Sequence, residues 1–522
     1  MAIFNVRNIG QAGVISDIAP WDLPDNALSD GRNFRVSSGK IQASGGSKLH
    51  SKFGAGTELG HIDQGHTFNG EGIWFVCGAD GIHSFNGAGF DFQHGASVHP
   101  DGWSTCKIGR VTFFNHPEYK PVYFASEDEN NSGISPLPWS PRHGDWAAKG
   151  CKARVLSSHR NFLFAMNTTE TVNGITEYSS DRVRWSHPVE PNGIPYTWEP
   201  ADNDDKSSLA GYVTLGRGGE IIGGESLRDA FVVYSTEAVN ILDYTGDSLM
   251  WRRRTVSQTA GLIGKDAVEE VRGTHYFMAY DDIIVFDGNQ AQSILHNRLR
   301  KRYASTIDTQ NLKNSFTYHN KTFNEIWFCF PEKGAVYPTM AYVFNYRDGS
   351  FAIRDLSLTR QFRHAHFGKT TGSDMTWNSV ETNWSTERSS WRLGGQTPFN
   401  GIALGVADEN VYLLDTQQPD EDIDTFVERE QMPVQGHENA TTITRLYPQI
   451  DGSSEVKISV GSHQHAGDGV QYKGTVPFRP GVDRKIDMRS TGELHAFRLE
   501  CKANSNLDLT GFDVEFEVAG KR

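Results

Sequence analysis

The sequence has few cysteines and no long apolar run. Its 522 residues include five cysteines, an odd number, scattered singly without a C-x-x-C spacing. This pattern excludes a disulfide framework and fits reduced thiols made in a cytoplasm. No segment approaches the roughly 18 apolar residues of a membrane span, and the start MAIFNVRNIG lacks a basic stretch followed by an apolar core. We therefore expect a soluble, unexported protein.

An excess of basic charge is also missing. The chain has 50 Lys and Arg residues against 64 Asp and Glu residues, which gives a formal net charge of −14. A protein whose main task is to grip nucleic acid needs a basic surface, so the charge argues against that class. It remains compatible with a protein past which nucleic acid slides.

Recognisable catalytic signatures are absent too, because the sequence has neither G-x-S-x-G nor H-E-x-x-H. The glycine-rich stretch from Gly216, GRGGEIIGGE, precedes a strand-like run instead of a helix, which favours a tight turn over a phosphate cradle. The adjacent acids Asp204-Asp205 and Asp281-Asp282 should point apart in turns, whereas glycosidase carboxylates face each other across about 5–9 Å. We expect no catalytic residues and no enzyme.

Glycine and aromatic residues are abundant, and they favour an all-β class. The stretch DAFVVYSTEAVNILDYTG, from Asp229, has two apolar runs around a polar turn, which is typical of a β-hairpin. The same plan returns in THYFMAYDDIIVFDGNQ and FNEIWFCFPEKG, and occurs earlier in GIWFVCGADGIHSFNG. The runs are nearly continuous in hydrophobicity, so both faces of each strand should be covered. Small stacked sheets of this kind predict a β-propeller-like body of five to seven blades.

Shifts in composition divide the chain into four parts. We predict an extended N-terminal arm over 1–50, the propeller-like body over 51–419 with loop insertions near 126–150 and 366–400, an acidic linker over 420–436, and a small C-terminal β-sandwich or closing sheet over 437–522.

Two His-x-His pairs are the weak candidates for a metal site: His364 with His366, and His463 with His465. Residues i and i+2 of a strand share one face and can hold a metal between them. A pair without a third ligand is more often two surface imidazoles, so no metal and no cofactor is expected. The acids between Asp420 and Asp424 fit a solvated linker better than a Ca²⁺ site.

Two basic clusters stand out in this acidic chain. They are the candidates for contacts to a neighbouring subunit or to an adaptor protein: Arg252, Arg253, Arg254, Arg300, Lys301 and Arg302. Acidic protein surfaces suit them better than phosphates do.

The hairpin series resembles a known family. RDAFVVYSTEAVNILDYTG, TVSQTAGLIGKDAVEEVRGTHYFMAYDDIIVFDGNQAQSIL and NEIWFCF are similar to the propeller of the tail nozzle protein, also called the tail stabilisation or head-completion protein, of short-tailed bacteriophages. The ending STGELHAFRLECKANSNLDLTGFDVEFEVAGKR resembles the terminal strands of that family. The opening GQAGVISDIAPWDLPDNALSDGRNFRVSSGKIQASGG is similar to the arm of many phage virion proteins.

This resemblance implies a structural protein of the virion tail, assembled in the cytoplasm of the bacterial host. It implies a homohexameric tube that is attached to the tail adaptor protein, carries fibre, spike or needle proteins, and conducts genomic DNA during ejection. The acidic charge predicts that the passing DNA is not bound tightly at about 0.15 M salt.

Two other classes remain open. A propeller glycoside hydrolase or depolymerase would use aromatic loops for sugar stacking, with these candidates: Trp139, Trp146, Trp377, Trp384 and Trp391. However, SSDRVRW matches a sialidase Asp box only in part and is not repeated. A lectin-like receptor-binding tail protein is the third class. Particle symmetry separates the three, because a six-fold ring, a monomer and a trimer are expected respectively.

Overall fold

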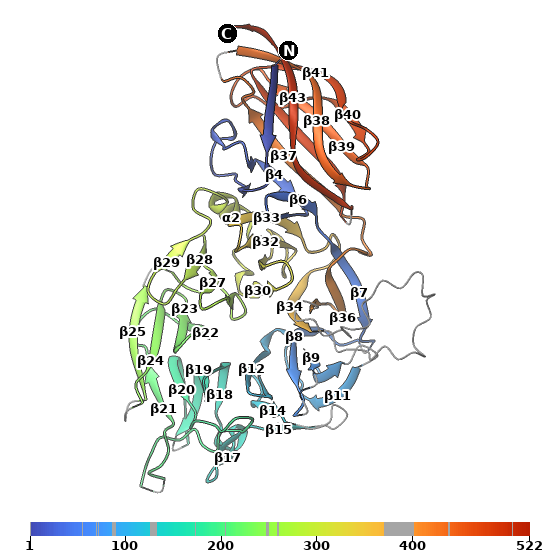
Figure 1. Cartoon of the computed structure of the whole chain (residues 1–522). Helices are drawn as coiled ribbons and strands as arrows, with labels where there is room; N and C mark the ends of the chain where they lie inside the picture. The colour runs from blue at the N-terminus through green and yellow to red at the C-terminus, as the bar shows by residue number, and fades with distance from the viewer. Residues whose placement is uncertain are drawn as a thin grey trace.

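The computed structural model describes residues 2–521, except 55, 69, 71, 86–89, 126–132, 173, 204, 247–249, 258–259, 370–400, 437–438 and 504. Strands predominate, and the described α-helices are α1 (Trp146–Lys149) and α2 (Arg300–Thr306). Figure 1 shows two lobes, a ring of small sheets and a sandwich of longer strands that holds both chain ends. No described helix is long and apolar enough to cross a bilayer. The predicted all-β class is confirmed.

The small sheets are the blades of a propeller, each with at least four strands. The first three blades are β8 (Leu59–His66), β9 (Gly72–Gly78), β10 (Gly81–Phe85) and β11 (Phe90–Gly95); β12 (Ser104–Ile108), β13 (Val111–Asn115), β14 (Val122–Phe124) and β15 (Ile134–Pro136); and β18 (Lys152–His159), β19 (Phe162–Val172), β20 (Ile175–Trp185) and β21 (Gly211–Thr214). The next two are β22 (Ile221–Leu227), β23 (Ala230–Ser235), β24 (Val239–Tyr244) and β25 (Trp251–Ser257); and β26 (Val268–Glu270), β27 (His275–Met278), β28 (Ile283–Phe286) and β29 (Ala291–Ser293). The sixth is β30 (Phe316–Asn320), β31 (Glu325–Phe330), β32 (Met340–Asn345) and β33 (Ser350–Asp355).

The seventh blade closes the ring. It contains β34 (Phe362–Lys369), β35 (Gly401–Ala407), β36 (Asn410–Thr416) and β7 (Gly46–Lys52), which precedes the first blade in the chain and pairs with β36. The inner strands of successive blades contact one another, and β34 contacts β8. A strand from the N-terminal side therefore ties the two ends of the ring together. The predicted propeller is confirmed, with seven blades.

The hairpins that dominate the sequence are the middle strands of blades four to six. In β23–β24, β27–β28 and β31–β32 nearly every residue is buried. A middle strand has a neighbouring blade on each face, which explains why its apolar run does not alternate.

The second lobe is a sandwich of two sheets, with strand orders β41-β38-β43-β6-β5, where β1 also pairs with β43, and β4-β37-β42-β39-β40. Its strands are β1 (Ala2–Arg7), β4 (Asp30–Arg32), β5 (Phe34–Ser37), β6 (Lys40–Ala43), β37 (Asp424–Met432), β38 (Asn439–Gly452), β39 (Val456–His463), β40 (Gln471–Phe478), β41 (Ile486–Gly492), β42 (Leu494–Lys502) and β43 (Leu507–Lys521). Phe497 and Phe512, from the two sheets, lie with ring centroids 4.6 Å apart. The predicted C-terminal sandwich is confirmed.

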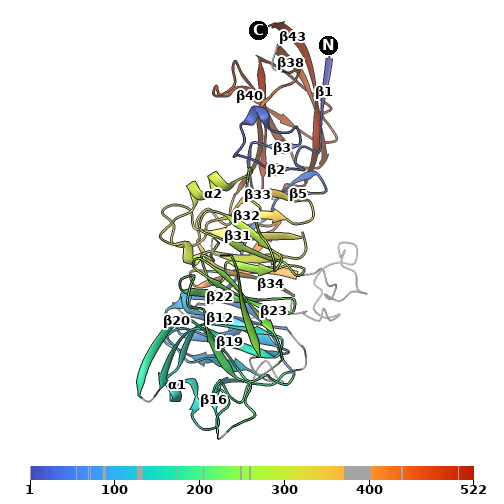
Figure 2. The same cartoon turned by 90° about the vertical axis from the view of Figure 1, so that its left-hand side faces the viewer.

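The N-terminal arm predicted over residues 1–50 supplies strands to both lobes. Besides the strands above, β2 (Gly13–Val14) and β3 (Ala27–Leu28) extend the sheet of the sixth blade through β33. Figure 2 shows these strands between the sandwich and the blades. Gly13 has φ 71°, and a Cβ there would lie 2.4 Å from the backbone of Phe351, so this approach requires glycine.

The predicted linker over 420–436 is wrong, because its residues form β37, which pairs with β42. The acids that indicated a solvated linker have basic partners instead. Asp420 binds Arg360, whereas Asp422 and Asp424 bind Lys502. Within the predicted insertion at 126–150, β16 (Pro138–Ser140), β17 (Gly144–Asp145) and α1 form a small subdomain. Of the insertion predicted at 366–400, residues 366–369 belong to β34 and the rest lies outside the described residues.

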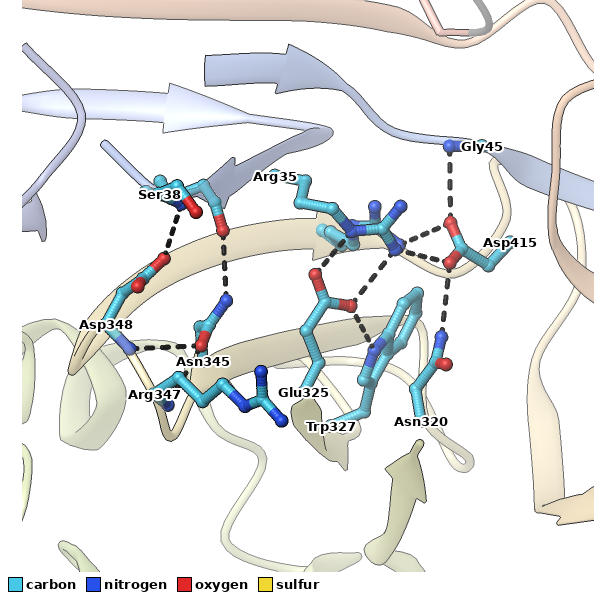
Figure 3. Close-up of polar contacts among 12 residues, drawn as sticks. Arg35, Ser38, Gly45, Asn320, Glu325, Trp327, Asn345, Arg347, Asp348 and Asp415 are labelled. Carbon is cyan, nitrogen blue, oxygen red and sulfur yellow. Dashed lines mark hydrogen bonds and ion pairs between the residues drawn. The ribbon is translucent and has the colours of Figure 1, made fainter. Parts of the chain in front are cut away.

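A buried ionic network joins the two lobes (Figure 3). Arg35 on β5 binds Glu325 on β31, with Nε 2.5 Å from Oε1, and also Asp415 on β36. Arg354 binds the other oxygen of Asp415 at 2.9 Å, and Trp327 donates its indole N–H to Glu325 at 3.1 Å. The four charged side chains are almost completely buried, and their two positive and two negative charges balance.

Candidate functional site

Polar side chains from the inner strands of blades seven, one and two meet at the centre of the ring. Thr105 and Lys107 on β12 and His366 on β34 surround Asp63 on β8. The Asp63 carboxylate accepts bonds from the Thr105 hydroxyl and the Lys107 ammonium, both at 2.7 Å, and lies 3.3 Å from His366 Nε2. Burial opposes the charge, but Lys107 and His366 outweigh it and hold the pKa of Asp63 well below its usual value. This carboxylate is therefore ionised.

Beside Asp63 lies a second cluster, made by His61 on β8, His364 on β34 and Asp266 just before β26. One potential ligand atom of each residue lies within 4.8 Å of those of the other two. The rings of His61 and His364 have centroids 4.0 Å apart. Burial lowers the pKa of both imidazoles, so both are neutral. His364 Nδ1 accepts one long bond, of 3.5 Å, from the backbone N–H of Ile62.

The hydrogen bonds of His61 define its tautomer. Its Nε2 lies 3.0 Å from the Thr105 hydroxyl oxygen, and that hydroxyl donates its only proton to Asp63. The oxygen can then only accept, so the proton of the neutral ring is on Nε2. Nδ1 carries the lone pair, and this buried atom has no hydrogen-bond partner within the described part of the chain.

Lys265 lies next to this cluster, where the inner strands begin. Its ammonium binds the Oδ2 atom of Asp266 and the backbone carbonyl of Trp103, the latter at 2.6 Å. Lys265 also lines a cavity of about 290 Å³, together with His99, Asp101, His116, Glu118 and Arg154.

A second cavity, of about 440 Å³, lies where the inner strands of blades four to six end. It is lined by Glu225, Glu269, Glu270, Arg272, His319 and Lys321, among others. Burial raises the pKa of Glu225 to about 7, and burial together with the charge of Glu225 raises the pKa of Glu269 to about 8. These two carboxyl groups hold protons near neutral pH.

Replacing Glu269 with glutamine should reduce the loss of unfolding free energy that occurs as the pH rises from 6 to 8. The folded pKa of about 8 lies above the unfolded value near 4.5, so folded protein binds the extra proton and loses stability as pH rises between these values. From pH 6 to pH 8 the Glu269→Gln variant should lose about 1–2 kcal/mol less unfolding free energy than the wild type, a figure kept low because Glu269 is partly exposed and solvent screens its charge. Denaturant unfolding at both pH values measures it. The exposed neighbour Glu270→Gln is the control, and equal pH slopes for all three proteins would contradict the assignment.

The predicted His pairs have different surroundings. His364 and His366 both reach the centre of the ring, but each has its own partners, Asp266 with His61 and Asp63 respectively. In the sandwich, His463 is buried and lies 2.8 Å from the carbonyl of Asp468, whereas His465 is 64% exposed and lies 3.5 Å from Glu493. The second pair therefore does not share one environment.

The predicted basic clusters lie on the outside, and four of their six side chains have partners within the chain. Arg252, Arg253 and Arg254 are exposed on β25, the outer strand of the fourth blade. Arg254 binds Asp243 at 2.8 Å, and Arg253 donates to the carbonyl of Thr214. On α2, ion pairs join Arg300 to Asp281 and Arg302 to Asp30, and the backbone N–H of Lys301 donates to Asp17. Their role in contacts with another subunit or an adaptor stays a prediction.

Two of the proposed sugar-stacking tryptophans are core residues. Trp139 and Trp146 are at most 2% exposed and pack edge-to-face with ring centroids 5.0 Å apart. They cannot stack on a sugar, so that prediction is wrong for both. Trp377, Trp384 and Trp391 lie outside the described residues.

His61 and Asp266 were not predicted, although the sequence carries a signal for His61. The inner strands of blades one, two and seven share the pattern polar-x-polar-x-Gly, in HIDQG from His61, TCKIG from Thr105 and HAHFG from His364. Aligning these segments brings His61, Asp63 and Lys107 into register with the predicted His pair. Asp266 lies in a loop and shows no such pattern.

Comparisons with known proteins bear on the fold class alone. No family model matches the chain, and no curated protein matches it. Among similar solved structures, YCF48 bound to D1 peptide has 8% identity and a TM-score of 0.38, covering 72% of this chain and 96% of that chain. The Neurospora crassa Pan2 WD40 domain has 8% identity and a TM-score of 0.36, covering 75% and 98%. An exo-beta-1,3-galactanase from Phanerochaete chrysosporium has 11% identity and a TM-score of 0.28, covering 81% and 97%. These low values give no argument about function.

Proposed function

We propose that the protein is a structural component of a phage virion, a subunit of the tail nozzle that closes the tail and conducts DNA during ejection. The segments that resemble nozzle proteins lie in blades four to six. They contain β23–β24, all strands of the fifth blade and the middle strand β31 of the sixth. The resemblance therefore follows structural units and is not confined to isolated turns.

The observation that carries the proposal is the combination of a closed propeller centre with a rigid, elongated subunit. Lys107 binds Asp63 of the neighbouring blade, and Lys265, before the fifth blade, binds the carbonyl of Trp103, before the second. Side chains therefore occupy the centre of the ring, which leaves no passage for DNA through one propeller. The sandwich and propeller share one continuous apolar core, which fixes their relative position. A subunit of this kind suits the wall of a tube whose channel lies between copies.

On this proposal, six copies form the tube, bind the tail adaptor protein and carry fibre, spike or needle proteins. The assembled particle in the virion should have six-fold symmetry at this protein. Because isolated subunits can stay monomeric until they meet the adaptor ring, the measurement is electron microscopy of the virion or of protein reconstituted with its adaptor. A trimer or a monomer on the particle would overturn the nozzle function.

A propeller glycoside hydrolase or depolymerase is the second candidate, favoured by one observation. Glu225 and Glu269 line the 440 Å³ cavity, and their raised pKa values suit proton donation. If this function is correct, purified protein releases sugar from host surface polysaccharide, and Glu225→Gln or Glu269→Gln abolishes the release. Six-fold symmetry without sugar release would leave the structural function alone. Binding of polysaccharide without cleavage by a trimer would support a lectin-like receptor-binding protein.

A further inference from the structure

We propose that His61, His364 and Asp266 form a binding site for a single Zn²⁺ ion at the centre of the propeller. This inference is independent of the tail function. Three residues from three separate parts of the chain bring two imidazoles and one carboxylate within 4.8 Å of one another. This donor set is typical of Zn²⁺ sites with three protein ligands and an open fourth position.

The state of His61 is the second observation that favours an ion. The side chain is only 4% exposed, and its unprotonated Nδ1 has no partner among the described residues. An unpartnered buried nitrogen costs free energy, which a metal bond would recover. The chain from Asp63 through the Thr105 hydroxyl to His61 Nε2 orients the ring from behind, in the way that outer-shell carboxylates orient metal-bound histidines.

The carboxylate of Asp266, the third ligand, binds Lys265 but keeps one oxygen available for the ion. Lys265 binds Oδ2 of Asp266, which leaves Oδ1 for the ion. The ligand atoms need to move together by about an ångström to reach the 2.0–2.2 Å bonds of Zn²⁺, a shift within the range of side-chain rotation.

The location of the site gives the ion a structural role. His61 belongs to the first blade and His364 to the last, so the metal joins the blades on either side of the ring closure, and Asp266 adds the start of the fifth blade. On the outside, the same closure is held by β7 on β36. Zn²⁺ would therefore fasten the inner edge of the ring where the two ends of the propeller meet.

The test uses the full chain, stripped of metal with a chelator. Calorimetric titration with Zn²⁺ should give one site, and Co²⁺ should produce the visible absorption of a four-coordinate N/O site. The melting temperature should rise by a few degrees with Zn²⁺. His61→Gln, His364→Gln and Asp266→Asn should each weaken Zn²⁺ binding by more than about 100-fold.

His463→Gln is the matched control, because His463 is equally buried but lies in the sandwich, and its Zn²⁺ affinity should equal that of the wild type. Thr105→Val removes the acceptor behind His61, together with one donor to Asp63, but no ligand atom. It should weaken binding about tenfold, which keeps the test decisive if a ligand variant fails to fold. Wild-type protein that binds no Zn²⁺, or a folded His61→Gln variant that binds it unchanged, would overturn the proposal.

Discussion

A chain that ends at Arg489 is expected to be insoluble. The deletion removes the end of β41 and all of β42 and β43, which are interior strands of both sandwich sheets. β43 hydrogen-bonds to β38, β1 and β6, and β42 lies between β37 and β39. Five strands would lose a partner at once. Exposed strand edges next to an open apolar core promote aggregation.

The loss of buried aromatic side chains also predicts that the shortened chain does not fold. Phe497 and Phe512 are buried between the sheets, and truncating one such phenylalanine to alanine already costs about 3–5 kcal/mol. Losing both costs about 6–10 kcal/mol, which already matches the 5–15 kcal/mol by which domains are normally stable, and the lost strand pairing adds to it. The soluble fraction after expression and size-exclusion chromatography measure the result.

A chain that ends at Val518 is the control for this deletion. It removes only the last residues of β43, where Ala519 and Gly520 are exposed. This protein should remain soluble and unfold like the full chain. If the longer deletion were also soluble with unchanged thermal unfolding, the C-terminal strands would be peripheral and the sandwich topology would be contradicted.

The sequence contained enough information for the class of fold, because middle strands leave a strong local signal. Runs such as Phe231–Tyr234 and Ile326–Phe330 are buried on both faces, and a turn follows each at a short distance. The blade count was not accessible in this way. Outer strands such as β25 and β29 are largely exposed and polar, so their composition resembles that of loops.

Local sequence patterns do not predict which distant strands pair with each other. β7 completes a blade with β36, more than 350 residues away, and β1 pairs with β43 from the opposite end of the chain. The acids around β37 indicated a linker for the same reason, since the basic residues that neutralise them are remote in sequence. The same limit applied to the central cluster, in which His364 was identified but His61 and Asp266 were not.

Replacing Arg35 with methionine should cost about 3–5 kcal/mol of unfolding free energy. The substitution leaves Glu325 and Asp415 buried with Arg354 as the remaining cation, and an uncompensated buried charge is strongly destabilising. Burial opposes ionisation of Arg35, but Asp415 and Glu325 raise its pKa, so the guanidinium is charged. Its loss therefore changes the net charge of the network by one. Because Arg35 lies on a sandwich strand and its partners lie on blades, the joint between the lobes weakens first.

Two further variants distinguish charge imbalance from lost packing. Adding Glu325→Gln to Arg35→Met restores a balanced pair of Arg354 and Asp415 and keeps an acceptor for the Trp327 indole, so the double variant should regain most of the lost stability. Arg32→Met breaks a half-exposed ion pair to Asp355 and should cost no more than about 1 kcal/mol. Denaturant unfolding of the four proteins measures these differences. If the double variant were less stable than Arg35→Met, removing the excess carboxylate would not have restored any unfolding free energy. Side-chain packing, and not charge balance, would then stabilise the contact between the lobes.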